Sequence, residues 1–203
     1  SILHSFINIT GPSADGININ GASNISILNT TILTSGNSGH GIVLLSSAEN
    51  LYFENITVQT SGNSASAIRI FNGNSFNNRF RGLTLITKGT NSYGFQLIAS
   101  NHKFSISDSI INASNAADFI VHSVSAGGEF NLTNVTRFDG GNLNIGWEVG
   151  GNGTLNVHWY LDAYANYTNS SNASGSNILA FDRNSLQRFS AVTGANGRIP
   201  RQV

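Results

Sequence analysis

Apolar and polar residues alternate over short runs along the chain, and these runs recur about every 26 residues. Each repeat carries two large apolar positions, which hold Ile17 and Ile19, Ile42 and Leu44, Ile68 and Ile70, Phe95 and Leu97, and Phe119 and Val121. Short alternating runs of β-branched and aromatic residues are typical of strands. The pattern therefore predicts a stack of similar β-coils.

Three further columns of aligned positions complete the repeat. Two of them are apolar. One apolar column holds Ile27, Phe53, Phe80, Ile106 and Leu132, and the other holds Ile32, Val58, Leu85 and Ile111. The third holds residue types common in turns, Asn29, Asn55, Gly82, Asp108 and Asn134. Three strands per repeat and no run of helical period predict an all-β parallel solenoid, in which each coil adds about 4.8 Å.

The repeats over about residues 5–157 resemble those of right-handed parallel β-helix proteins, the superfamily that includes pectate lyases, copper-chaperone-like periplasmic proteins and many archaeal surface proteins. The resemblance lies in the repeat pattern and not in a catalytic motif, so it implies a fold more than a function. The fold it implies is a right-handed parallel β-helix with about 26 residues per coil and five to six coils.

Turn-forming groups divide residues 1–157 into successive coils. Residues 1–14 are expected to form an incomplete first coil, followed by coils over 15–38, 39–64, 65–91, 92–115 and 116–139. The register weakens at Arg137, which stands where the column requires Ile or Val, so residues 140–157 are predicted to form a looser last coil.

The rhythm changes at His158 to that of antiparallel strands. Residues 193–199, with 159–162, resemble carboxypeptidase-regulatory-like β-sandwich modules, which often follow β-helices in archaeal surface proteins; the stretch 168–176 replaces their usual Gly-x-Pro turn. We predict that 158–203 is an incomplete β-sandwich segment, completed by another chain or by sequence beyond Val203, with assembly candidates Trp159, Tyr160, Ile199 and Val203. A tail folded along its own solenoid is the alternative.

Charge is sparse, because ten Lys and Arg balance ten Asp and Glu. A neutral surface has no electrostatic footprint for nucleic acid. No apolar run is long enough to span a membrane, and Cys is absent. Met is absent even at position 1, so we expect the chain to start inside a larger precursor. The polar surface comes instead from 29 Asn and 27 Ser.

Eleven Asn-x-Ser/Thr sequons suggest an exported, cell-surface glycoprotein, although a chain this rich in Asn and Ser forms some sequons by chance. The glycosylation candidates are Asn8, Asn24, Asn29, Asn55, Asn112, Asn131, Asn134, Asn152, Asn166, Asn169 and Asn172.

Catalytic and metal sites are not predicted. Glycan cleavage needs paired carboxylates, but the acids fall in different columns or in non-adjacent coils, and Asp108 is interpreted as part of an amide ladder rather than as a catalytic acid. Glu54 and Arg81 are expected to form a surface pair. The five His share no column and lack metal-binding spacing, so we expect no metal and no cofactor.

Aromatic residues gather late in the chain, at Trp147, Trp159, Tyr160 and Tyr164. We interpret them as a cap over the last coil, with a carbohydrate-binding face as the alternative. The sequence as a whole favours a non-enzymatic structural protein of an archaeal cell envelope, such as a surface-layer, sheath, filament or adhesin subunit, that self-assembles into a homo-oligomer or polymer. A glycan-binding or glycan-cleaving β-helix is the alternative.

Overall fold

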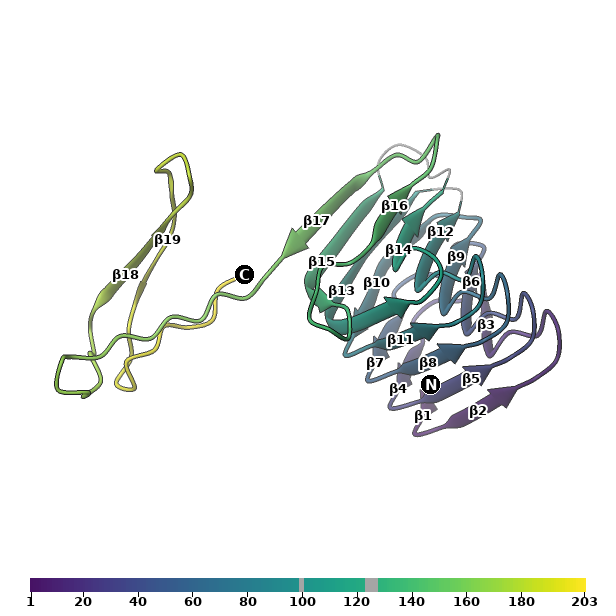
Figure 1. Ribbon diagram of the computed structural model, residues 1–203, viewed down its shortest axis with the longest axis horizontal. Helices are drawn as coiled ribbons and strands as arrows, with labels where there is room; N and C mark the ends of the chain where they lie inside the picture. Colours follow the sequence, from purple (N-terminus) through teal and green to yellow (C-terminus); the bar gives the residue numbers. More distant parts are fainter. Residues whose placement is uncertain (99–100, 123–127) are drawn as a thin grey trace. The chain divides into compact units, whose positions relative to one another are not determined.

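The computed structural model describes residues 1–98, 101–122 and 128–203 of the protein. The chain divides into two compact units, Ser1–Val157 and His158–Val203. The first unit is a parallel β-solenoid of about six turns with about 26 residues per turn, as the repeat predicts (Figure 1). Within the described ranges there is no helix, and so none that could span a membrane.

One face of the solenoid is a six-stranded parallel sheet, which we call sheet B. Its strands lie side by side in the order in which the chain makes them (Figure 1). They are β3 (Ile17–Asn20), β6 (Ile42–Leu45), β9 (Ile68–Phe71), β12 (Phe95–Ile98), β14 (Phe119–Val121) and β16 (Ile145–Trp147).

The other two faces belong to an eleven-stranded sheet, sheet A. Its first face contains β1 (Ile2–Leu3), β4 (Ser26–Leu28), β7 (Tyr52–Glu54), β10 (Ser75–Arg81), β13 (His102–Ala113), β15 (Glu129–Thr136) and β17 (Thr154–His158). Its second face contains β2 (Phe6–Ile9), β5 (Thr31–Thr34), β8 (Thr57–Thr60) and β11 (Thr84–Thr87). The faces form one sheet because β13 runs through both and pairs with β10 and with β11.

The strand register confirms the predicted columns. Ile42 pairs with Ile17 and Ile68, Phe53 with Ile27 and Phe80, and Val58 with Ile32 and Leu85. The apolar residues of these columns point inward in the middle coils, where Leu44, Phe53 and Val58 are fully buried. A single coil could not bury this surface, so the stack supplies the core that each coil lacks.

The column of turn residues lies between the first and second faces of sheet A. Its members all have positive φ, 50° for Asn29 and Asp108, 54° for Asn55 and Asn134, and 62° for Gly82. Asn, Asp and Gly adopt this left-handed conformation at the lowest cost among the amino acids. The turn interpretation of the column is therefore confirmed, and each residue bends its coil at the same place.

Stacked aromatic rings fill much of the core. The rings of Phe53 and Phe80 are 4.7 Å apart and nearly parallel, and those of Phe95 and Phe119 are 5.6 Å apart. Phe104 packs among them from sheet A, 5.1 Å from the ring of Phe95. Offset-stacked rings at these distances add to the hydrophobic gain of burying them.

The expected break at Arg137 has a structural reason. Three coils close a turn with a buried Thr, whose hydroxyl donates to a backbone carbonyl, as Thr60 does to Ala65. The fourth equivalent position is Ala113, whose N–H donates instead to the buried carboxylate of Asp118, 2.7 Å away. Arg137 pairs with that carboxylate. Arg137 interrupts the apolar column because the buried charge of Asp118 requires an oppositely charged partner.

The last coil continues the stack. β16 pairs in parallel with β14, and β17 pairs with β15. Its strands are less buried than those of the coils before it, since β16 and β17 contain only half-buried and exposed residues. The predicted looser coil over residues 140–157 is therefore present.

The second unit is a narrow antiparallel structure. β18 (Asn177–Phe181) and β19 (Gln187–Val192) form a two-stranded sheet, in which Ile178 pairs with Ala191. Leu161 and Gln202 exchange two backbone hydrogen bonds of 2.9 and 3.1 Å. The predicted antiparallel strands are present, within the small sheet and the isolated bridges beside it.

Candidate functional site

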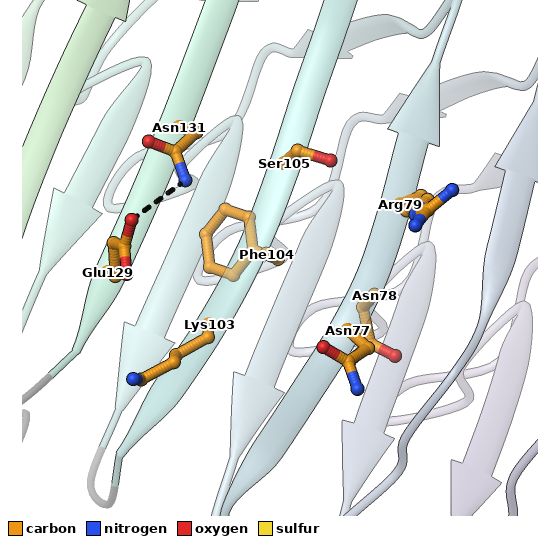
Figure 2. A pocket seen from close by; sticks show the side chains of 8 residues that line it. All are labelled: Asn77, Asn78, Arg79, Lys103, Phe104, Ser105, Glu129 and Asn131. Carbon is orange, nitrogen blue, oxygen red and sulfur yellow. Dashed lines mark hydrogen bonds between the residues drawn. The ribbon is translucent and has the colours of Figure 1, made fainter.

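A shallow depression of about 250 Å³ lies on the outward side of β10, β13 and β15 (Figure 2). Parallel strands place their outward side chains at the same level, so Arg79, Ser105 and Asn131 stand in one row. Lys103 and Glu129 form the row before it. Asn77 lies at the edge and also lines the neighbouring depression beside Tyr52.

An irregularity in β10 shapes this depression. The register between β10 and β13 shifts between Ser75 and Asn78, which places Asn78 inside the coil. Its buried amide accepts a 3.0 Å hydrogen bond from the Leu51 N–H and donates one of 2.9 Å to the Ala48 carbonyl. Asn78 thus satisfies backbone groups that the shifted strand leaves open, which is a structural role.

The chemistry of the depression is that of hydrogen bonding. Among the eight residues that line it, Glu129 is the single carboxylate, and it accepts a 3.3 Å hydrogen bond from Asn131 (Figure 2). Hydrolysis of a glycosidic bond by the common mechanism uses two carboxylates. The lining therefore offers amide, guanidinium and ammonium groups for binding, without a paired acid and base.

A second pocket, of about 420 Å³, lies against the outward side of sheet B. A chain of side-chain hydrogen bonds crosses it from coil to coil. The Ser66 hydroxyl donates to Gln96 Oε1 over 2.8 Å, and Gln96 Nε2 lies 3.1 Å from Nε2 of His122. His122 Nδ1 lies 2.5 Å from the Glu148 carboxylate. Each donor in this chain meets an acceptor.

His40 and Arg69 form the other side of this pocket, which we call the sheet B pocket. The Ser66 N–H donates to His40 Nδ1 over 2.9 Å, and Arg69 Nη1 lies 2.9 Å from His40 Nε2. The pKa of His40 is lowered to about 4, mainly by burial and secondly by the charge of Arg69, while Asp15 opposes both effects. Burial also lowers the pKa of Arg69. His40 is thus neutral at pH 7.

The expected surface pair is present, with an additional partner. Arg81 lies 3.9 Å from Glu54, its register neighbour, and 3.6 Å from Asp108. Asp108 also accepts a 3.0 Å hydrogen bond from the amide of Asn134, the next residue of the turn column. This geometry supports the structural interpretation of Asp108, as part of a ladder of amides and carboxylates.

The sequons fall into different environments. Several belong to hydrogen-bonded pairs, as Asn55 does with Asn29 at 3.1 Å and Asn131 with Asn156 at 2.9 Å. The others whose side chains make hydrogen bonds are Asn24, Asn134, Asn169 and Asn172. Asn112 is half-buried within β13.

Three sequons present a free amide. Within the described part of the chain, the side chains of Asn8, Asn152 and Asn166 are exposed and form no hydrogen bond with another residue. Asn152 stands in the loop before β17, and Asn166 forms an isolated backbone bridge with Asn172. These positions leave the most room for a covalent glycan.

The assembly candidates differ in exposure. Trp159 is 46% exposed and Val203 is 72% exposed, while Ile199 is only 6% exposed and belongs to the small interior of the second unit. The guanidinium of Arg201 lies over the ring of Tyr160, 4.7 Å from its centre. The side chain of Ile199 is therefore buried, and its backbone N–H donates to the Ala163 carbonyl over 3.2 Å.

The aromatic residues predicted to cap the solenoid belong to different units. Trp147 lies in β16 and packs against Phe130 of the coil before, with ring centres 6.4 Å apart. Tyr164 lies in the second unit, where Arg198 covers its ring at 5.5 Å. Only Trp147 is therefore shown to pack on a core residue of the last coils.

The sheet B pocket is the feature that the sequence pattern missed. His40 and His122 stand in different columns, so no repeat alignment connects them, yet both line the same pocket. The sequence did contain one sign of this pocket, which is the polar residues at outward positions of sheet B. Two of them, Arg69 in β9 and Gln96 in β12, are neighbours in the strand register. The described residues contain no group of three or more His, Cys, Asp or Glu that could hold a metal ion.

Comparison with known proteins leaves the family open. No protein-family model, curated protein or solved structure matches this chain.

Proposed function

We propose that this chain is a structural protein of the cell exterior that works through self-assembly, with the second unit as the joining element. The observation that carries the proposal is the small interior of this unit. Of residues 158–203, all described, only Ala173, Thr193, Gly197 and Ile199 are buried. Units with so little buried apolar surface rarely persist alone in water, and this one has no disulfide to stabilise it.

The β18–β19 hairpin leaves apolar side chains and strand edges exposed. Leu179 and Phe181 on β18 and Val192 on β19 are each at least half exposed. Among the described residues these two strands pair only with each other, so both outer edges keep unpaired backbone groups. Exposed edges and apolar side chains together are the features that a further strand would cover.

A second copy of the chain is the partner that this surface suits. Charged residues make up 10% of the chain and its net charge is zero, so electrostatic attraction to a charged partner contributes little. Main-chain hydrogen bonds between strands need no charge. An identical hairpin offers matching edges and matching apolar side chains, as in isologous dimers.

The location outside the cell is supported by the surface chemistry. The exposed sequons at Asn8, Asn152 and Asn166 suit a glycoprotein, and solubility comes from Asn and Ser rather than from charge. The resemblance to archaeal surface β-helices, and of the second unit to a regulatory-like β-sandwich, belongs to the same proposal. A surface layer, sheath, filament or adhesin would each use such a rod.

The test is the oligomeric state of the full chain, measured by light scattering after gel filtration over a range of concentrations. We expect oligomers whose population grows with concentration, and ordered assemblies in electron micrographs. Phe181→Asp places a charge on the exposed side of the hairpin and is expected to give a monomer.

The matched control is Val149→Asp, which adds the same charge at a fully exposed apolar residue of the first unit. It should assemble like the unchanged protein. Assembly that survives Phe181→Asp, or a monomer with a folded second unit at high concentration, would exclude the hairpin as the joining element.

A further inference from the structure

The sheet B pocket contains a conflict between hydrogen-bond donors. A backbone N–H and a guanidinium can only donate, and a neutral imidazole has one accepting nitrogen. The Ser66 N–H occupies Nδ1 of His40, so Nε2 carries the proton and faces Arg69 Nη1 at 2.9 Å. Two donors are therefore directed at each other, while the neighbouring chain from Ser66 to Glu148 is satisfied.

Protonation changes do not resolve this conflict. Arg69 stays charged at any physiological pH, since guanidinium pKa values lie far above it. Protonation of His40 would add a second donor rather than an acceptor. Among the described residues no carboxylate lies within 4.0 Å of Arg69, and its buried Nε has no hydrogen-bond partner. The missing component is an oxygen atom that accepts from both His40 and Arg69.

The charged residues around the pocket favour an uncharged ligand as the source of that oxygen atom. Asp15 accepts a 3.0 Å hydrogen bond from the His40 backbone N–H, and Glu148 lies beside His122. Among the described residues that line the pocket, Arg69 is the only Lys or Arg, and these two carboxylates make the surroundings unfavourable for an anion. Tyr93, the remaining titratable group, has its pKa raised by burial and by Glu148, and it is neutral.

The rest of the lining suits a sugar. Tyr93 supplies an aromatic ring, and Ser38, Ser64 and Asn91 supply hydroxyl and amide groups at the rim. The guanidinium of Arg69 lies over the ring of Phe71, 4.7 Å from its centre, which supports its planar group from one side. A volume of about 420 Å³ is within the usual range for a small-molecule site.

We propose that the sheet B pocket binds a neutral saccharide, with a hydroxyl or carbonyl oxygen of the sugar between His40 Nε2 and Arg69. The guanidinium turns into the pocket to admit this oxygen, which then accepts two hydrogen bonds of about 2.8 to 2.9 Å. Tyr93 packs against the sugar ring. The proposal does not depend on self-assembly, because every residue involved lies within one solenoid.

The experiment is NMR titration of the full chain, labelled with ¹⁵N at histidine and arginine. The probes are glucose, N-acetylglucosamine and their β-1,4-linked disaccharides, with glucuronate and inorganic phosphate as charged comparisons. The free protein should show His40 as the Nε2–H tautomer. At least one neutral sugar should shift the His40 and Arg69 signals, and the charged probes should bind more weakly.

Variants separate binding from folding. Arg69→Met removes one of two opposed donors, so thermal stability should be unchanged or higher, while affinity for the neutral sugar should fall at least tenfold. The matched control is Arg183→Met, at an exposed arginine of the second unit, which should bind like the unchanged protein. If Arg69→Met does not fold, Tyr93→Ala serves as the second variant, with a tenfold loss expected.

Three results would overturn the proposal. The first is the absence of any sugar-induced shift at His40 and Arg69, which would leave water as the bridging group. The second is tighter binding of glucuronate or phosphate than of every neutral sugar, which would make this an anion site. The third is an equal loss of affinity in Arg183→Met, which would show that the loss does not report on the sheet B pocket.

Discussion

Individual inward residues of the solenoid each hold several coils together. Leu44 in β6 is fully buried, and its register neighbours Ile19 and Ile70 belong to the coils on either side. A change at one such residue is therefore felt by three coils. This makes a single side chain a sensitive test of the register.

Leu44→Asn should destabilise the solenoid by about 2 to 4 kcal/mol, because it buries an amide without partners and removes packing against both neighbours. Denaturant unfolding followed by circular dichroism measures the change. The control Val149→Asn, at a fully exposed position, should alter stability by less than about 0.5 kcal/mol. A loss below about 1 kcal/mol for Leu44→Asn would show that the side chain is not in the core.

His40 should make the stability of the solenoid depend on pH. Its pKa of about 4 in the folded chain lies below the ordinary value of 6.5, so the unfolded chain binds the proton more tightly. The stabilising contribution is complete above about pH 6.5 and is lost as the pH falls towards 4.

The slope from this one group is at most about 1.4 kcal/mol per pH unit. His40→Gln should flatten the profile of unfolding free energy between pH 6.5 and 4, and His158→Gln, at an exposed histidine, should leave the profile as it was. Equal profiles for the unchanged protein and His40→Gln would contradict the lowered pKa.

Coils stack closely where their turns carry small residues. A Cβ added at Gly62 would lie 2.1 Å from the Gly36 carbonyl oxygen, and one at Gly89 would lie 1.9 Å from the Gly62 oxygen. Gly11 begins this column, and there the nearest atom would be 3.5 Å away. The backbones of successive coils therefore touch at this column, and a side chain would separate them.

Gly62→Ala should cost about 1 to 3 kcal/mol, because the added methyl group forces two coils apart. Gly11→Ala is the matched change at the open end of the same column, and it should be close to neutral. Thermal melting of both variants measures the difference. Similar melting temperatures would mean that the coils are stacked differently at this turn.

The whole molecule combines a well-packed rod with a second unit that has almost no interior. Five Phe residues are fully buried in the rod, whereas the second unit buries one large apolar side chain, Ile199. The exposed sequon asparagines whose side chains make no hydrogen bond with another described residue are Asn8 and Asn152 in the rod and Asn166 in the second unit. The distribution suits a protein whose rod is stable and whose second unit joins or displays.

Mass spectrometry of native material should find hexose-bearing peptides that contain Asn152, Asn166, Asn169 or Asn172, sites outside the stacked coils or in their last turn. Asn55 and Asn134 should be unmodified, because their amides donate to Asn29 and to Asp108. Unmodified peptides at all four of the first group would remove the main support for a glycosylated envelope protein.

The sequence by itself determined the columns, the three strands per coil and the turn at Asn55, because a solenoid repeats one local environment and each apolar or turn position recurs at a fixed interval. It also located the change of rhythm at His158. Only the tertiary structure decided which residues of different columns are in contact. Arg137 pairs with the buried Asp118, and His40 lies opposite Arg69. These contacts join residues 19 and 29 positions apart, which no single repeat interval connects.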